Sequence, residues 1–92
     1  MFNLFGKKNA SQYDIHQVSE NCYVVHLNDE QSKVLEAKGL TDVRELTLTR
    51  CESTWKVEYS YQLPDGSWKG VSSGGIAFAD EPLEAVLKQF FE

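Results

Sequence analysis

Large apolar or β-branched residues alternate with polar ones through residues 43–78, which is the pattern of a sheet with one buried face. Turn signals near Glu52-Ser53 and at Pro64-Asp65-Gly66 divide this stretch into three strands. In the second turn, Pro fixes the first φ angle and Gly takes the left-handed position that closes a bulged hairpin. The pattern therefore predicts an antiparallel three-stranded meander.

One register sorts the side chains of this meander into an apolar and a polar face. The turns set the pairs Leu48–Val57, Tyr59–Val71 and Tyr61–Lys69. The apolar face collects Leu46, Leu48, Trp55, Val57, Tyr59, Tyr61, Leu63 and Val71. The polar face collects Glu45, Thr47, Thr49, Lys56, Glu58, Ser60, Gln62 and Trp68. The apolar face is the predicted core.

Two adjacent glycines, Gly74 and Gly75, interrupt the third strand of the meander. Glycine adds no side-chain packing to a strand and commonly marks a bulge. A bulge of one residue would shift the alternation, so that Ile76 and Phe78 join Val71 on the core face. The other interpretation is a close approach of the backbone to a ligand or an anion.

Tyr13–Ser19 and Cys22–Leu27 have the pattern of a first hairpin around a two-residue turn. This loop length pairs Ile15 with His26. His16 and His26 then lie on opposite faces, which argues against a shared metal site, and no cofactor or metal is expected.

Two helices are predicted, one before and one after the meander in the chain. Asn28 and Gln31 form a capping box for a helix over about Asp29–Lys38, and Gly39 is a left-handed stop. Asp80-Glu81-Pro82 opens the second helix. Its apolar stripe consists of Leu83, Val86, Leu87 and Phe90, and Phe91 lies off the stripe.

The fold class is α+β, in the order β-β-α-β-β-β-α, with a hairpin and a three-stranded meander packed by two helices. We expect an N-terminal arm over residues 1–12 and a single domain over 13–92. From residue 28 onward the order of elements is similar to that of double-stranded-RNA-binding domains. That family opens its second helix with a lysine-rich motif, whereas residues 79–84 read Ala-Asp-Glu-Pro-Leu-Glu here. An acidic start repels phosphate, so nucleic-acid binding is not expected.

Charge and composition narrow the classes of partner. Fourteen acidic residues against nine basic ones give a net charge of −5, which disfavours binding to nucleic-acid backbone or anionic lipid. No stretch is long and apolar enough for stable membrane insertion. Two cysteines and no secretory signal indicate a reduced, cytoplasmic protein. Three roles are open for Phe2, Leu4 and Phe5 of the arm. They could pack on the domain, attach it weakly to a membrane surface as a short amphipathic segment, or bind as a peptide in an apolar groove of another protein.

The sequence favours a small acidic, non-enzymatic module that binds another protein through its polar sheet face and acidic helices, as an accessory or inhibitor-like protein. Trp68 is a large aromatic on that face, and it anchors a partner or packs over the hairpin. Its expected neighbours in the partner-binding site are Gln62, Lys69 and Glu58. A homodimer is left open, because a chain this small gains stability from a partner.

Two other classes of function stay open. A small-ligand pocket between the sheet and the last helix would be lined by Trp55, Tyr59, Tyr61, Gly74 and Gly75. An enzyme would use Cys51, His16 or His26 with a nearby carboxylate. No nucleophile–base spacing is visible in the sequence, so we do not expect an enzyme.

Overall fold

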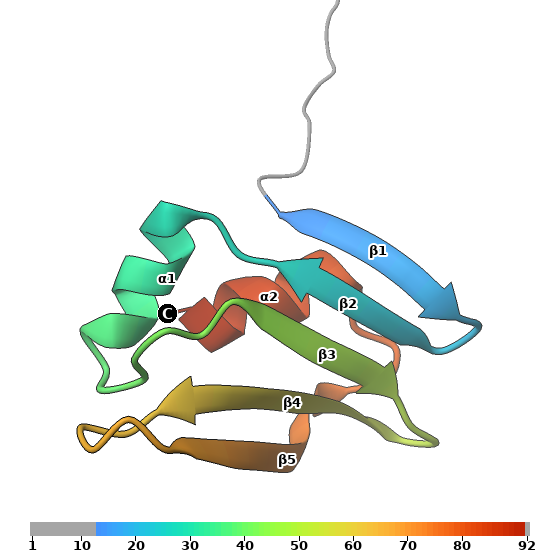
Figure 1. Ribbon diagram of the computed structural model, residues 1–92. Helices are drawn as coiled ribbons and strands as arrows, with labels where there is room; N and C mark the ends of the chain where they lie inside the picture. Colours follow the sequence, from blue (N-terminus) through green and yellow to red (C-terminus); the bar gives the residue numbers. More distant parts are fainter. Residues whose placement is uncertain (1–12, 92) are drawn as a thin grey trace, which may run out of the picture.

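The computed structural model describes residues 13–91. They form one open antiparallel sheet of five strands, whose order across the sheet follows the chain (Figure 1). The elements are β1 (Asp14–Ser19), β2 (Cys22–His26), α1 (Asp29–Glu36), β3 (Glu45–Arg50), β4 (Thr54–Gln62), β5 (Trp68–Phe78) and α2 (Leu83–Phe91). The predicted α+β class and element order are confirmed. The predicted arm, residues 1–12, lies outside the described residues.

Both helices pack on the same side of the sheet, with α2 running across it and α1 beside it (Figure 1). The fully buried core consists of Val25, Leu35, Val43, Leu46, Leu48, Trp55, Val57, Val86 and Leu87. Four of these come from the predicted apolar face of the meander, and two come from the predicted stripe of α2. The opposite side of the sheet carries no helix within residues 13–91, and we call it the open face.

The ends of α1 follow the capping signals. The Asn28 side chain accepts a hydrogen bond from the Gln31 amide at 2.8 Å, and the Gln31 side chain accepts one from the Asn28 amide at 3.0 Å. Gly39 adopts a φ of 87°, and the Leu40 amide donates to the Leu35 carbonyl, which ends the helix. The helix ends at Glu36, two residues before the predicted end.

Aromatic contacts hold the far end of α2. Phe90 meets Tyr59 edge-on, with ring centroids 5.7 Å apart, so the predicted stripe does pack on the apolar sheet face. Phe91, which the helical stripe left out, stacks on Tyr13 at 5.8 Å. The side chain off the stripe therefore joins the last helix to the beginning of β1.

The meander has the predicted register. Leu48 pairs with Val57 in β3–β4, and Tyr61 pairs with Lys69 in β4–β5. The Pro-Asp-Gly turn closes as expected, because Gly66 has a φ of 91° and the Leu63 amide donates to the Ser67 carbonyl. The turn and the alternation agree with each other, which is why both were readable from the sequence.

The predicted register of the first hairpin is wrong beyond its turn. Ser19 pairs with Cys22 as a two-residue turn requires, but the register shifts between Gln17 and Ser19. This bulge leaves Val18 as an extra residue and makes Ile15 pair with Val25 rather than with His26. Every side chain before the bulge therefore points to the face opposite to the predicted one.

The bulge at Gly74-Gly75 is confirmed in place but is larger than predicted. Between the pairs Lys56–Gly74 and Thr54–Phe78, three residues of β5 face one residue of β4. Two extra residues reverse the alternation twice, so Phe78 returns to the side of Thr54 and is 73% exposed. Ile76 packs against the core as predicted, whereas the placement of Phe78 in the core was wrong.

Candidate functional site

The open face is a polar surface built from alternate residues of all five strands. By their pairing these residues include Asp14, His16, Cys22, Val24, His26, Glu45, Thr47, Thr49, Lys56, Glu58, Ser60, Gln62, Trp68, Gly70 and Ser72. Those of β3 and β4, together with Trp68, belong to the polar face that the sequence predicted. No buried polar or charged residue occurs within residues 13–91, so the polar chemistry of this part of the chain lies at the surface.

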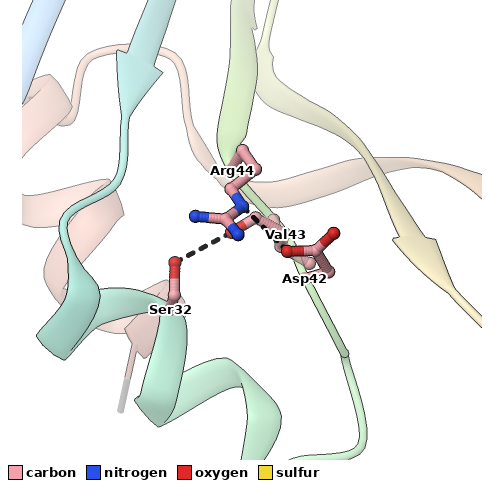
Figure 2. A network of polar contacts seen from close by, with 4 residues as sticks. All are labelled: Ser32, Asp42, Val43 and Arg44. Carbon is pink, nitrogen blue, oxygen red and sulfur yellow. Dashed lines mark hydrogen bonds and ion pairs between the residues drawn. The ribbon is translucent and has the colours of Figure 1, made fainter.

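The loop before β3 borders the open face through Asp42 and Arg44, and polar contacts hold it in place (Figure 2). Asp42 has a φ of 61°, which is uncommon for a residue with a side chain, and its carboxylate accepts a hydrogen bond from Arg44 Nε at 2.8 Å. Ser32 of α1 donates from Oγ to the Val43 carbonyl at 3.0 Å. The Gln62 amide donates to the Thr41 carbonyl at 2.8 Å. The loop is thus tied to α1 and to β4.

A groove of about 630 Å³ lies on the open face between this loop and β5. We call it the open-face groove. Its lining is Asp42, Arg44, Glu45, Thr47, Glu58, Tyr59, Ser60, Trp68, Gly70, Val71 and Ser72. Small side chains make the hollow, because Ser60 pairs with Gly70 and Glu58 pairs with Ser72, which leaves little bulk above the strands.

Trp68 stands on β5 at the groove and is 54% exposed. It is directly opposite Gln62, whose side chain donates to the Gly66 carbonyl at 3.2 Å and so lies along the hairpin. Glu58 also lines the groove. Lys69 does not join them, because it pairs with Tyr61 and therefore points to the other side of the sheet. Three of the four predicted partner-binding residues thus share the open face.

The lining of the groove is acidic. Asp42, Glu45 and Glu58 contribute three carboxylates against the single guanidinium of Arg44, which is already paired with Asp42. Lys56 lies two residues before Glu58 on the same face of β4, and its Nζ atom is 3.8 Å from the Glu58 carboxylate. An aromatic side chain beside carboxylates is a surface suited to basic and apolar groups together.

Two histidines meet on the open face, contrary to the sequence prediction. The bulge at Val18 turns His16 to the side of His26, and the two rings lie edge to face with centroids 4.9 Å apart. His16 Nε2 is 2.9 Å from Asp14 Oδ1, and His26 Nδ1 is 3.6 Å from Glu45 Oε2. Alternation alone gave no sign of this cluster.

The histidine cluster has no metal-binding geometry. Among residues 13–91, no group of three or more His, Cys, Asp or Glu side chains is placed to hold a metal ion. The thiols also lie apart from it: Cys22 is four residues from His26 along β2, or roughly 13 Å. Cys51 is exposed beyond the end of β3. The structure therefore places each histidine beside a carboxylate but brings neither thiol to them.

The residues of the alternative ligand pocket are not arranged around one cavity. Trp55 is fully buried, its Nε1–H donates to the Glu81 carbonyl at 3.0 Å, and Tyr23 packs on it with ring centroids 5.9 Å apart. Burial and, secondly, the neighbouring Tyr61 raise the pKa of Tyr59, whose ring meets Phe90. Core side chains thus occupy the space between the aromatic residues and α2.

Gly74 and Gly75 belong to the bulge of β5. Gly75 has a φ of 72°, a conformation that side chains seldom adopt, and this is the reason for a glycine there. A smaller hollow of about 280 Å³ adjoins it, lined by Thr54, Gly75, Ile76, Ala77, Phe78, Glu81 and Gln89. Trp55, Tyr59 and Tyr61 do not line this hollow, so the residues predicted to form one ligand pocket do not share a cavity.

Comparison of the chain with protein-family models, with curated proteins and with solved structures found no match. No helix in the described part of the chain has the length and apolar character needed to cross a membrane. The open face and its groove are therefore the features of the molecule that point to a function.

Proposed function

We propose that this protein is a non-enzymatic interaction module whose open-face groove binds a basic and apolar segment of another protein. The observation that carries the proposal is the 54% exposed Trp68 beside a groove of about 630 Å³. Exposed Trp is costly in contact with water and is enriched among residues that dominate binding energy. The module would serve an accessory or inhibitor-like role, and its expected cytoplasmic location stays a prediction.

The charge of the groove supports a basic segment as its ligand. Glu45 and Glu58 have only weak partners at 3.6 and 3.8 Å, so their carboxylates are available to an incoming Lys or Arg. The same cationic side chain gains from the face of Trp68. A peptide lying along the groove would therefore place an apolar or cationic residue on Trp68 and a cation between the two carboxylates.

The alternative, a small-molecule pocket between the sheet and α2, has less support. It requires Trp55 to line an open cavity, and that ring is fully buried with its only N–H bonded to Glu81. The acidic helices remain part of the proposal only as a source of long-range attraction for a basic partner.

The proposal can be tested by selecting random peptides displayed on phage against the purified protein. We expect enrichment of sequences that combine Lys or Arg with aromatic or aliphatic residues. Synthetic versions of the selected peptides should lose at least about tenfold in affinity for the Trp68→Ala variant, because removal of a central aromatic anchor commonly costs more than 1.4 kcal/mol. The Glu58→Lys variant should bind them more weakly still at low salt.

Val18→Ala is the matched control, since Val18 is also an exposed apolar side chain but lies on β1, outside the groove. It should bind the peptides like the wild type. Circular dichroism shows whether each variant is folded. Equal affinity of the wild type and a folded Trp68→Ala variant would refute the proposed site, as would a selection that yields no binding peptide.

A further inference from the structure

Both histidines of the chain meet on the open face. The sequence has two histidines among 92 residues, and the rings of His16 and His26 lie edge to face with centroids 4.9 Å apart. Histidine is the side chain whose charge ordinarily changes between about pH 5 and 8. This pair is therefore the place at which the open face can gain positive charge in mild acid.

The bulge in β1 is what brings the two rings together. Val18 is the extra residue, and without it the alternation would turn His16 to the side of the helices. The bulge interrupts the pairing of β1 with β2 and leaves the Val18 side chain 60% exposed. Bulges commonly re-aim a side chain beside a functional site, and here the re-aimed side chain is that of His16.

The ionisable groups around His26 come from the two strands that flank it. Within residues 13–91, β1 supplies His16 and Asp14, which lie 2.9 Å apart from Nε2 to Oδ1, and β3 supplies Glu45, which pairs directly with His26. His26 Nδ1 is 3.6 Å from Glu45 Oε2, beyond hydrogen-bond distance. The guanidinium of Arg44 is engaged by an ion pair at 2.8 Å within the loop before β3. Glu45 is therefore the carboxylate that a protonated His26 would attract.

Glu45 belongs to two sites at once. It lines the open-face groove, where its carboxylate is available to a basic ligand, and it also faces His26, which does not line the groove. A neutral His26 leaves this carboxylate to the ligand. A protonated His26 would draw it into a charge-assisted hydrogen bond of about 2.7–2.9 Å. The imidazolium and a cation of the ligand would then compete for the same group.

From these observations we infer that the histidine pair makes the open-face groove release its basic ligand in mild acid. This pH response, which rests on the proposed function, has a second cause besides the competition for Glu45. Within residues 13–91, the open face and its groove carry four carboxylates and two cations, namely Asp14, Asp42, Glu45 and Glu58, and Arg44 and Lys56. Two added positive charges cancel this negative excess and with it the attraction for a basic segment. By linkage, a bound ligand opposes protonation of the pair.

Peptide affinity at two pH values tests this response. A synthetic peptide from the phage selection, chosen without His, Asp or Glu so that its own charge stays constant, is titrated into the protein in a calorimeter at about pH 7.5 and about pH 5.5, at one salt concentration. We expect the wild type to bind it at least about fivefold more weakly at the lower pH. In His26→Gln the change should stay below about twofold, because a neutral side chain leaves Glu45 to the ligand at both pH values.

His16→Gln is the matched control, because it replaces the other ring of the pair while the contact between His26 and Glu45 stays, and it should keep most of the pH response. Both variants should bind like the wild type at the higher pH, since neither histidine lines the groove, and circular dichroism at both pH values shows whether they are folded. Equal wild-type affinity at both pH values, or a full pH response in His26→Gln, would overturn the inference and leave the proposed function standing. A selection without binding peptides would instead overturn the proposed function and the pH response with it.

Discussion

Replacement of Trp55 by Phe separates a structural role of this ring from a role in a ligand pocket. The ring is fully buried, and its Nε1–H donates to the Glu81 carbonyl just before α2. Phe cannot make this part-buried hydrogen bond, and leaving the carbonyl without its donor costs about 1–3 kcal/mol. The smaller ring also leaves part of the core unfilled, which costs about 1 kcal/mol more. We expect a total loss of about 2–4 kcal/mol.

A loss of this size is large for a chain of 92 residues, whose free energy of unfolding is about 5–14 kcal/mol. Urea unfolding followed by circular dichroism measures it directly, and the melting temperature should fall by roughly 10–30 °C. Trp68→Phe is the matched control: its side chain is exposed, so the change should stay within about 0.5 kcal/mol. A loss below about 1 kcal/mol for Trp55→Phe would refute the core role of Trp55 and restore the pocket.

Two further predictions concern the cap of α1 and the ionisation of Tyr59. Asn28→Ala should lower the free energy of unfolding in urea by about 1 kcal/mol, because it removes the capping box with Gln31; an unchanged midpoint would contradict the role of the box. The raised pKa of Tyr59 favours the neutral phenol in the folded protein. Its contribution to stability is therefore complete below the ordinary pKa of 10.0 and is lost as the pH rises through the folded pKa. Absorbance titration of the wild type and of Tyr59→Phe measures this, and ionisation of Tyr59 at or below pH 10.0 would contradict the assignment.

The sequence predicted the parts of the fold where local and long-range signals coincide. The capping residue Asn28 and the turn glycine Gly66 act on their immediate neighbours, and both behave as expected. The alternation of Leu46, Leu48 and Val57 was readable because one face of the sheet must be buried. The open face followed from the same alternation, and with it the exposure of Trp68.

The errors arose at the two bulges, which depend on tertiary packing. Nothing about Val18 marks it as an extra residue in β1, and its effect was to reverse the predicted face of His16. At Gly75 the glycine did mark a bulge, but not that it holds two extra residues, so Phe78 was assigned to the wrong side. Each unrecognised residue changes the side of every side chain beyond it, so a small local error moved whole groups.

The groove itself could not be predicted, because its wall depends on a backbone conformation without a local signal. Asp42 adopts a positive φ although no glycine is present, and the pairing of Thr41 with Gln62 holds the loop over the sheet. An acidic residue in such a conformation is tolerated where surrounding contacts over-determine it. Here the Arg44 bond and the Ser32 bond provide those contacts.

Strand β5 contains poor strand formers at positions where a strand is nonetheless required. Gly70, Ser72 and Ser73 pack little against their neighbours, and a sequence selected only for stability would have β-branched residues there. Among the strands of residues 13–91, only β4 pairs with it. Departures from local preference are expected at functional sites, where another requirement prevails. The small side chains of Gly70 and Ser72 leave room for the groove on the open face, so the proposed binding surface originates in a weak strand.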